Sequence, residues 1–509
     1  MSDPASNIPP ESDPERYFRT DHLETDLKGR SVRSGIVTLS SQILKFLLNI
    51  GGTIVLARLL TPQDYGLIAM VSTVSSLVVI FQDLGLSGAT IQKPQINQAQ
   101  VSTLFWINFG LGVAIALFMG AISPLLAWFY QEPRLVGITL VVSLGFILGG
   151  LTVQHQALLK RQMRFVSLAV IDIVSMIISV IVGIIAAFYG AGYWALAIGP
   201  LVGSMANMVG TWLVCPWRPG PPVRHSGIGS MLAFGGNLTG FNFLNYFSRN
   251  FDNVLIGWRF GAEQLGFYDK AYQLLLLPIR QINVPIANVA LPALCRLQSD
   301  PERYKSYYYK AIRLMVTFGM PVVAFMCVSA DKAILLLFGK QWVGAILLFQ
   351  LLSPQAFLGT FNVATGWVYA SLGHVQRQLR WQIMASVVTV LSFIIGLPWG
   401  AAGVAIAYSI CSIILRFPEL SYCYQGTPLR LTVFLATIAR PALASIGAAV
   451  ALAGMQLLLP KMNLAIGLLV DSVLYSLFYI ALWLCPPNGK QAVSEILRIA
   501  KTIKKPKES

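Results

Sequence analysis

Residues 48–58 read LNIGGTIVLAR, and residues 249–259 read RNFDNVLIGWR. Each stretch closes a long apolar segment and ends on an arginine. Two further pairs of similar stretches follow in the same order along the chain: RQMRF at 161–165 with RQLRW at 377–381, and GAGYWALA at 190–197 with GAAGVAIA at 400–407. Three echoes at offsets of 201 to 216 residues predict that one half of the chain repeats the other.

The composition is that of a membrane protein. Of 509 residues, 55% are hydrophobic and only 11% are charged, against about 25% charged residues in a soluble domain. The net charge of +16 indicates basic cytoplasmic loops rather than nucleic-acid binding. The six cysteines have no CxxC spacing, so neither a disulfide framework nor a metal site is expected.

A helix needs about 20 apolar residues to cross the hydrocarbon. The hydropathy pattern predicts spans at 34–57, 65–90, 102–129, 135–158, 166–189, 192–214, 229–257, 265–292, 306–328, 344–372, 381–397, 401–423, 430–459 and 464–484. With both termini in the cytoplasm, 13 basic residues, Arg416 among them, fall in inner loops, and six, Lys332 among them, in outer loops. The positive-inside rule favours that orientation.

The expected fold is an all-α polytopic membrane protein of about 14 helices. Two parallel six-helix repeats are followed by two extra C-terminal helices. The expected parts are a disordered cytoplasmic tail (1–30), an N-terminal lobe (31–214), a cytoplasmic linker (215–228), a C-terminal lobe (229–424), helices 13 and 14 (425–485) and a basic cytoplasmic tail (486–509). The two basic pentapeptides would lie in equivalent inner loops as topology anchors, or else bind anionic headgroups.

Polar residues form stripes on three of the predicted helices. A charge at mid-membrane costs at least about 2.5–3.5 kcal/mol, so such residues normally face a cavity. Helical spacing places Lys45 and Asn49 on one stripe of the first helix, Asn245, Arg249 and Asp252 on one of the seventh, and Gln273 and Arg280 in the eighth. The cations predict an anionic substrate. The candidate substrate-binding residues are Lys45, Asn49, Asn245, Arg249, Gln273 and Arg280.

Intramembrane carboxylates can bind Na⁺ or H⁺ and drive transport. The candidates are Asp252, Asp83 and Asp172. Two alternatives stay open, since Asp252 could neutralise Arg249 three residues away, and Asp83 could fix the turn DLGLSGA. No cofactor or metal is expected apart from the coupling ion. The chain lacks GxxxxGK[ST], HExxH and GxSxG motifs and any long loop, so an enzyme is not expected.

Four stretches carry a family resemblance: ARLLTPQDYGLIAM (57–70), FQDLGLSGATIQ (81–92), STLFWIN (102–108) and DNVLIGWRFGAEQLGFYDKAYQLLLLP (252–278). Together they resemble the Wzx/WzxC-like polysaccharide flippases of the multidrug/oligosaccharidyl-lipid/polysaccharide superfamily. The resemblance implies a bacterial inner-membrane protein for polysaccharide export. It would flip undecaprenyl-pyrophosphate-linked oligosaccharides across the membrane by ion-coupled alternating access.

The resemblance also suggests residue roles and partners. Lys45 and Arg280 occupy places comparable to cationic residues of related flippases, and in relatives the last two helices form a groove for the lipid tail. Many relatives have arginine directly after the glycine of "IG", whereas here Trp258 precedes Arg259, so no role is transferred to Arg259. Membrane lipids, a polysaccharide polymerase and the export machinery are expected partners, and nucleic acid is not.

Two other functions fit parts of the sequence. An exporter of small cationic drugs would need an acidic cavity, whereas the predicted one is basic. The other is a non-transporting scaffold of a polysaccharide synthesis complex, in which the basic C-terminal tail would bind a partner protein. A scaffold would not need charged residues inside the membrane, which counts against this function.

Overall fold

The computed structural model describes Phe18 and residues 27–83, 85–93, 95–223, 229–460 and 462–484, and among them leaves the side chains of 27–36, 39, 80, 81 and 229–249 undescribed. Within these ranges the regular structure is entirely helical. The two predicted tails lie outside the described residues, apart from Phe18 and the first residues of α1.

The first compact unit extends to Gly266. Its helices are α1 (Leu27–Leu59), α2 (Pro62–Asp83), α3 (Leu86–Gln92), α4 (Gln98–Tyr130), α5 (Arg134–Arg161), α6 (Phe165–Phe188), α7 (Trp194–Val214) and the first part of α8 (Gly229–Arg296). The boundary between the two compact units therefore lies inside α8, and the predicted lobes 31–214 and 229–424 stay predictions.

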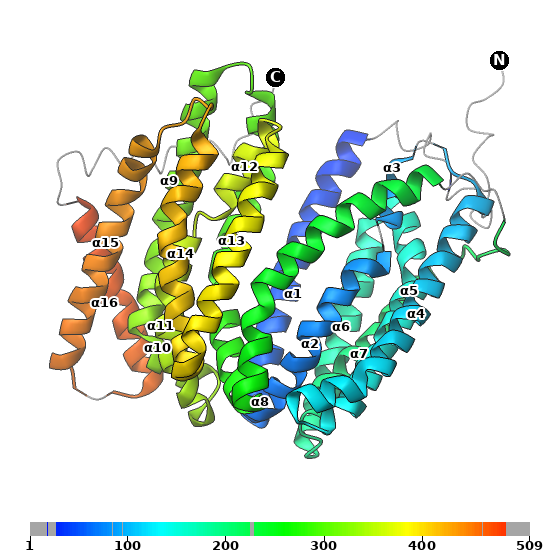
Figure 1. Cartoon of the computed structure of the whole chain (residues 1–509), viewed down its shortest axis with the longest axis horizontal. Helices are drawn as coiled ribbons and strands as arrows, with labels where there is room; N and C mark the ends of the chain where they lie inside the picture. The colour runs from blue at the N-terminus through cyan, green and yellow to red at the C-terminus, as the bar shows by residue number, and fades with distance from the viewer. Residues whose placement is uncertain are drawn as a thin grey trace. The chain divides into compact units, whose positions relative to one another are not determined.

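The second unit holds the rest of α8 and the remaining helices (Figure 1). These are α9 (Pro301–Val328), α10 (Ala330–Leu337), α11 (Val343–Gly359), α12 (Val363–Ser371), α13 (Val375–Gly396), α14 (Gly400–Tyr424), α15 (Leu431–Leu458) and α16 (Leu464–Leu484), with short 3₁₀ turns at Lys340–Trp342 and Leu397–Trp399. Helices α15 and α16 pack on each other and on α9.

Eleven of the described helical segments are long and apolar enough to cross a membrane, which agrees with the predicted class of fold. Several predicted boundaries are wrong. The second span ends at Asp83, because Gly85 turns the chain with φ 70° before α3 begins. The tenth is interrupted between α11 and α12. The seventh and eighth, predicted at 229–257 and 265–292, are two helices that meet within α8 at a kink, where Gly261 is non-helical with φ 80°.

Backbone turns locate the repeat more securely than sequence echoes do. Met163 (φ 52°) and Gly373 (φ 74°) form corresponding turns 210 residues apart, and Gly190 (φ 79°) and Gly400 (φ 78°) form another pair at the same offset. The echo at 190–197 and 400–407 therefore marks equivalent positions. The pentapeptide echo does not, because RQMRF spans the turn between α5 and α6 whereas RQLRW lies inside α13, six residues out of register.

The pentapeptide arginines bind the exposed carbonyl groups at helix ends. Arg164 donates to the carbonyl of Val214, the last residue of α7 (3.3 Å). Arg377 donates to the carbonyls of Gln425 (2.7 Å) and Tyr422 at the end of α14. The last carbonyls of a helix have no partner within it and carry partial negative charge, so a guanidinium is well placed there.

The start of α2 and the part of α8 that follows Gly261 pack closely against each other at two glycines. A Cβ on Gly66 would lie 1.6 Å from the carbonyl oxygen of Ala262, and a Cβ on Gly266 would lie 1.9 Å from that of Pro62. Gly66 thus packs against the backbone of Ala262, four residues before Gly266, and Gly266 packs against the backbone of Pro62, four residues before Gly66. This reciprocal contact joins α8 to the start of α2 and explains why the first unit extends to Gly266.

The described part of the linker is fastened to α4. Gln98 donates to the carbonyl of Arg218 (2.9 Å), and the Trp106 indole donates to that of Gly220 (2.8 Å). The Gly220 amide donates to Ser102 Oγ (3.0 Å). Residues 224–228 lie outside the described residues.

Candidate functional site

A chain of polar side chains crosses the first unit. Lys45 of α1 forms an ion pair with Asp172 of α6. Asn207 of α7 donates to the other carboxylate oxygen of Asp172 (3.2 Å). Gln156 of α5 donates in turn to the Asn207 carbonyl oxygen (2.9 Å). Four helices thereby contribute one polar residue each, and the structure brings together one predicted substrate residue and one predicted ion-coupling residue.

The lysine end of this chain is the accessible end. The Lys45 and Asp172 side chains are 25% and 36% exposed, and Asn49, one turn further along α1, is exposed on the same helical face. Both side chains can therefore be reached from outside the first unit, and a second anion can compete with Asp172 for the Lys45 ammonium.

The stripe predicted on the seventh helix lies on α8. Asp252 is buried, with 2% of its surface exposed, and accepts a hydrogen bond from the Asn253 amide (2.9 Å). Arg249 and Asn245 are helical, but their side chains lie outside the described residues. The alternative pairing of Asp252 with Arg249 is therefore neither supported nor opposed.

Further along α8, Gln273 bridges two charged residues that the sequence analysis did not select. Its amide donates to Asp269 (2.7 Å), and its carbonyl oxygen accepts from Lys270 (3.2 Å). Arg280 is exposed and makes no hydrogen bond or ion pair with any residue in the described ranges. An arginine with this exposure can bind an anion without first losing a partner.

Asp83 is held by the turn that it precedes. One carboxylate oxygen accepts from the Ser87 amide (2.9 Å) and the other from the Ser87 hydroxyl. These bonds fix the turn at Gly85 between α2 and α3. The contact is the one expected if Asp83 stabilises the DLGLSGA turn, and the role in ion coupling stays a prediction.

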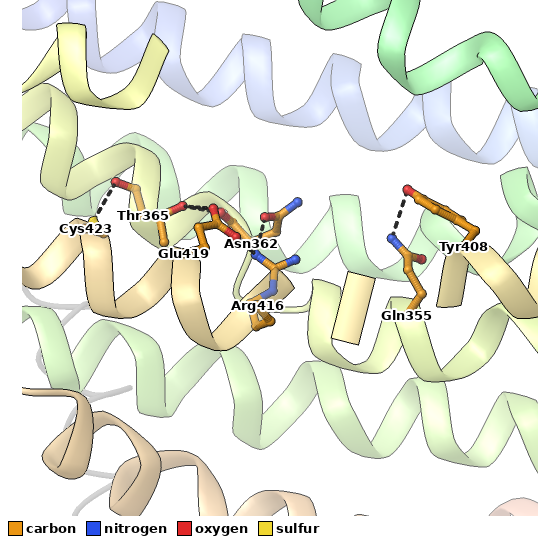
Figure 2. Close-up of polar contacts among 7 residues, drawn as sticks. All are labelled: Gln355, Asn362, Thr365, Tyr408, Arg416, Glu419 and Cys423. Carbon is orange, nitrogen blue, oxygen red and sulfur yellow. Dashed lines mark hydrogen bonds and ion pairs between the residues drawn. The ribbon is translucent and has the colours of Figure 1, made fainter. Parts of the chain in front are cut away.

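A second polar cluster lies where α11 is interrupted before α12 (Figure 2). Arg416 of α14 donates to Asn362 Oδ1 and to Glu419 Oε2, both at 2.7 Å, and lies over the Phe361 ring at 5.7 Å. Thr365 donates to the other oxygen of Glu419 (3.0 Å). The sequence analysis missed this cluster, because it counted Arg416 among the inner-loop cations although the predicted span 401–423 includes it. The structure places Arg416 inside α14, which ends at Tyr424, and buries it.

Figure 2 also shows a smaller contact, in which Gln355 of α11 donates to the Tyr408 hydroxyl of α14 (3.3 Å). The Tyr408 hydroxyl lies 3.4 Å from that of Tyr272 on α8. These bonds join three helices of the second unit. The Arg416 cluster thus holds α14 against the start of α12, and the Gln355 contact holds α14 against α11.

A third ion pair anchors α16. Lys332 of α10 lies 2.6 Å from the fully buried Asp471, whose same oxygen accepts from Gln456 of α15 (2.8 Å). The aliphatic part of the Lys332 side chain packs over Gly467, where an added Cβ would lie 3.5 Å from Lys332 Cδ. Lys332 is thus part of the packed helices and not, as predicted, an outer-loop cation. The pair joins the two helices outside the repeat to α10.

The accessible cationic side chains can bind anions. No group of histidine, cysteine and carboxylate side chains that could hold a metal ion occurs among the described residues. Of the predicted substrate residues whose side chains the structure describes, Asn49, Gln273 and Arg280 are exposed and Lys45 is partly exposed.

Comparisons with known proteins agree with the sequence resemblance. The profile of a family described as "Polysaccharide biosynthesis protein" matches residues 55–347. The chain is 24% identical over 367 residues to the lipopolysaccharide biosynthesis protein WzxC of Escherichia coli (strain K12), covering 71% of this chain and 74% of that protein. It is 25% identical over 345 residues to the teichuronic acid biosynthesis protein TuaB of Bacillus subtilis (strain 168), covering 67% and 71%.

Solved structures share the fold. The lipid II flippase MurJ in an inward closed conformation superposes with a TM-score of 0.71 at 14% identity, covering 89% of this chain and 98% of that one. An inward-facing multidrug transporter of the MATE family gives a TM-score of 0.61 at 16% identity, covering 77% and 97%. The predicted fold class is thereby confirmed.

Proposed function

The chain belongs to the polysaccharide biosynthesis protein family, and we propose that it moves a lipid-linked oligosaccharide from the cytoplasmic to the outer leaflet of a bacterial inner membrane. The substrate would be an undecaprenyl-pyrophosphate-linked repeat unit destined for polysaccharide export. The single observation that carries the proposal is the accessible Lys45, which is held by one carboxylate between two helices apolar enough to span a membrane.

A polar head group must cross the hydrocarbon of the membrane, and a cation on its path helps it to do so. The sugar head group is too polar for the hydrocarbon, whereas the prenyl tail dissolves in it. A protein that carries the head group must therefore offer it polar contacts within the membrane. In our proposal the diphosphate replaces Asp172 as the partner of Lys45. Exchange of one anion for another avoids leaving a buried charge without a partner.

We propose that Na⁺ or H⁺ drives the transport and that Asp252 is the first candidate for binding it. Asp252 is buried, and an ionised carboxylate in such a place gains most from a bound cation or proton. Asp172 and Asp83 are the second choices, because both are less buried than Asp252. In the proposed orientation both termini are cytoplasmic. A polysaccharide polymerase and the export machinery are the proposed partners.

The proposal is tested with purified protein in liposomes. Transbilayer movement should be fast for a polyprenyl-diphosphate-linked oligosaccharide and slow for the same sugar on neutral polyprenol, since only the former offers an anion to Lys45. An ion gradient should change the rate for wild type but not for Asp252→Asn. Equal rates for the charged and neutral lipids would refute the role given to the cations.

A further inference from the structure

An apolar groove of about 680 Å³ lies between α13 and α14, inside a segment apolar enough to span the membrane. Its walls include Leu391 and Ile395 of α13 and Ile406, Ile410 and Ile414 of α14. These side chains are between 42% and 65% exposed, so the groove opens on the surface of the second unit.

The groove offers almost nothing to water. Ser392 and Cys411 are its polar lining residues, both buried, and the Ser392 hydroxyl already donates to the Thr389 carbonyl (2.7 Å). A water molecule needs two to four polar partners to be held in a cavity. Within a membrane such a groove is therefore filled by hydrocarbon.

The corresponding helices of the first repeat are packed closely instead. At Gly199 of α7 a Cβ would lie 2.9 Å from the Ser179 carbonyl oxygen of α6, and at Gly203 it would lie 2.7 Å from the Ser179 Cβ. At Gly210 an added Cβ would lie 3.3 Å from Ile171 Cγ2. A row of glycines thus lets α6 and α7 approach along much of their length.

The second repeat lacks this row of glycines. At the offset of 210 residues fixed by the turns, Gly199, Gly203 and Gly210 correspond to Ser409, Ile413 and Leu420. Close backbone approach of α13 and α14 occurs at Gly396 and Gly403, where an added Cβ would lie 2.5 Å and 2.3 Å from the facing carbonyl oxygen. The two helices share less contact than α6 and α7 do. The duplication has therefore diverged where the groove lies.

We propose that this groove binds the polyprenyl tail of the lipid-linked substrate while the head group is carried. The inference rests on the proposed function, which requires a substrate with a long apolar tail. Apolar side chains line the groove, which ends near the Gly396–Gly403 contact, so it fits a chain laid along the two helices. The site differs from the groove of the last two helices that the family resemblance implied.

Photolabelling tests the site separately from transport. The probe is a polyprenyl diphosphate that carries a diazirine in its tail and no sugar, added to the full-length protein in liposomes. Labelled peptides should map to 388–415, and unlabelled polyprenyl diphosphate should compete, whereas an excess of diacyl phosphatidate should not. Labelling concentrated on α15 and α16, or equal competition by phosphatidate, would overturn the proposal.

A filling variant supplies the matched comparison. Ile410→Trp fills the groove and should reduce labelling about tenfold, as expected for the loss of roughly two buried methylene groups. Met205→Trp makes a similar addition at an exposed position of α7 and should leave labelling unchanged. Unreduced labelling in a well-folded Ile410→Trp protein would contradict the site. If oligosaccharide transport fails while labelling behaves as expected, the groove stands and the proposed substrate head group is wrong.

Discussion

Lys45 and Asp172 are 127 residues apart in the chain and form an ion pair between α1 and α6. Asn207 and Gln156 extend the contact across the first unit. The pair combines a cation that can bind a diphosphate with the carboxylate that the diphosphate would replace.

Replacing Lys45 by glutamine should weaken binding of a polyprenyl diphosphate at least tenfold, because hydrogen bonds to charged groups contribute about 1.5–3 kcal/mol. Asp172→Asn removes the competing anion and should leave binding as tight or tighter. Equilibrium binding to purified protein measures both. Lys340→Gln removes a cation at an exposed place and serves as the control. If Asp172→Asn bound the polyprenyl diphosphate more weakly than Lys45→Gln does, the ion pair would stabilise the fold and Lys45 would not bind the diphosphate.

Arg377→Gln should lower stability by about 1 kcal/mol, because the end of α14 loses a charged donor to its terminal carbonyls. Arg380, three residues away in the same pentapeptide, is exposed, and Arg380→Gln should leave stability unchanged. Thermal unfolding in detergent compares the two variants. Equal shifts would mean that the loss of charge, and not the helix cap, is responsible.

Gly66→Ala should be strongly destabilising, by about 2–3 kcal/mol or more, since the methyl group cannot fit beside the Ala262 carbonyl without moving backbone. Gly51→Ala is the control, because a Cβ there meets nothing within 4 Å. Alanine in that helix should be neutral or stabilising. The yield of monodisperse protein and its unfolding temperature report the difference, and a normal Gly66→Ala protein would show that α2 and α8 do not approach so closely.

Breaking the Lys332–Asp471 pair should cost about 3–5 kcal/mol if one partner is removed, since the other charge is left in a dry interior. Lys332→Met or Asp471→Leu alone should therefore reduce the unfolding temperature sharply. The double variant should recover most of the loss, because it leaves no unpaired charge. Additive losses in the double variant would show that the two residues act independently.

Burial raises the pKa of the Cys215 thiol to about 11 from its model-compound value of 9.0. The reactive thiolate is therefore nearly absent at neutral pH and increases only as pH approaches 11. Maleimide should label the exposed Cys295 first and leave Cys215 unreacted in the folded protein. Rapid labelling of Cys215 at pH 8 would show that the linker does not cover it.

Hydropathy and helical spacing predicted the class of fold and the polar face of α1, because both depend on local sequence. They could not predict the partners, since Lys332 and Asp471 are 139 residues apart and nothing near either residue specifies the other. Hydropathy predicted the end of α14 to within one residue, but Arg416 was still counted as a loop cation, because its contact with Asn362 and that of Glu419 with Thr365 cannot be read from the local sequence.

The pentapeptide echo was misleading for a related reason. Short basic sequences recur by chance at membrane boundaries, whereas the turns at Gly190 and Gly400 are constrained by their backbone conformation. Gly66 and Gly266 were both present in the quoted sequence, but nothing local to either residue predicts that α2 packs against α8.

The rate of transbilayer movement of a polyprenyl-diphosphate-linked oligosaccharide, measured in liposomes with wild-type protein and with Lys45→Gln, tests the central claim most directly. The account predicts rapid movement with wild type and, at equal amounts of folded protein, a rate reduced at least tenfold in Lys45→Gln. Wild-type liposomes no faster than protein-free ones, or a fully active Lys45→Gln variant, would contradict it.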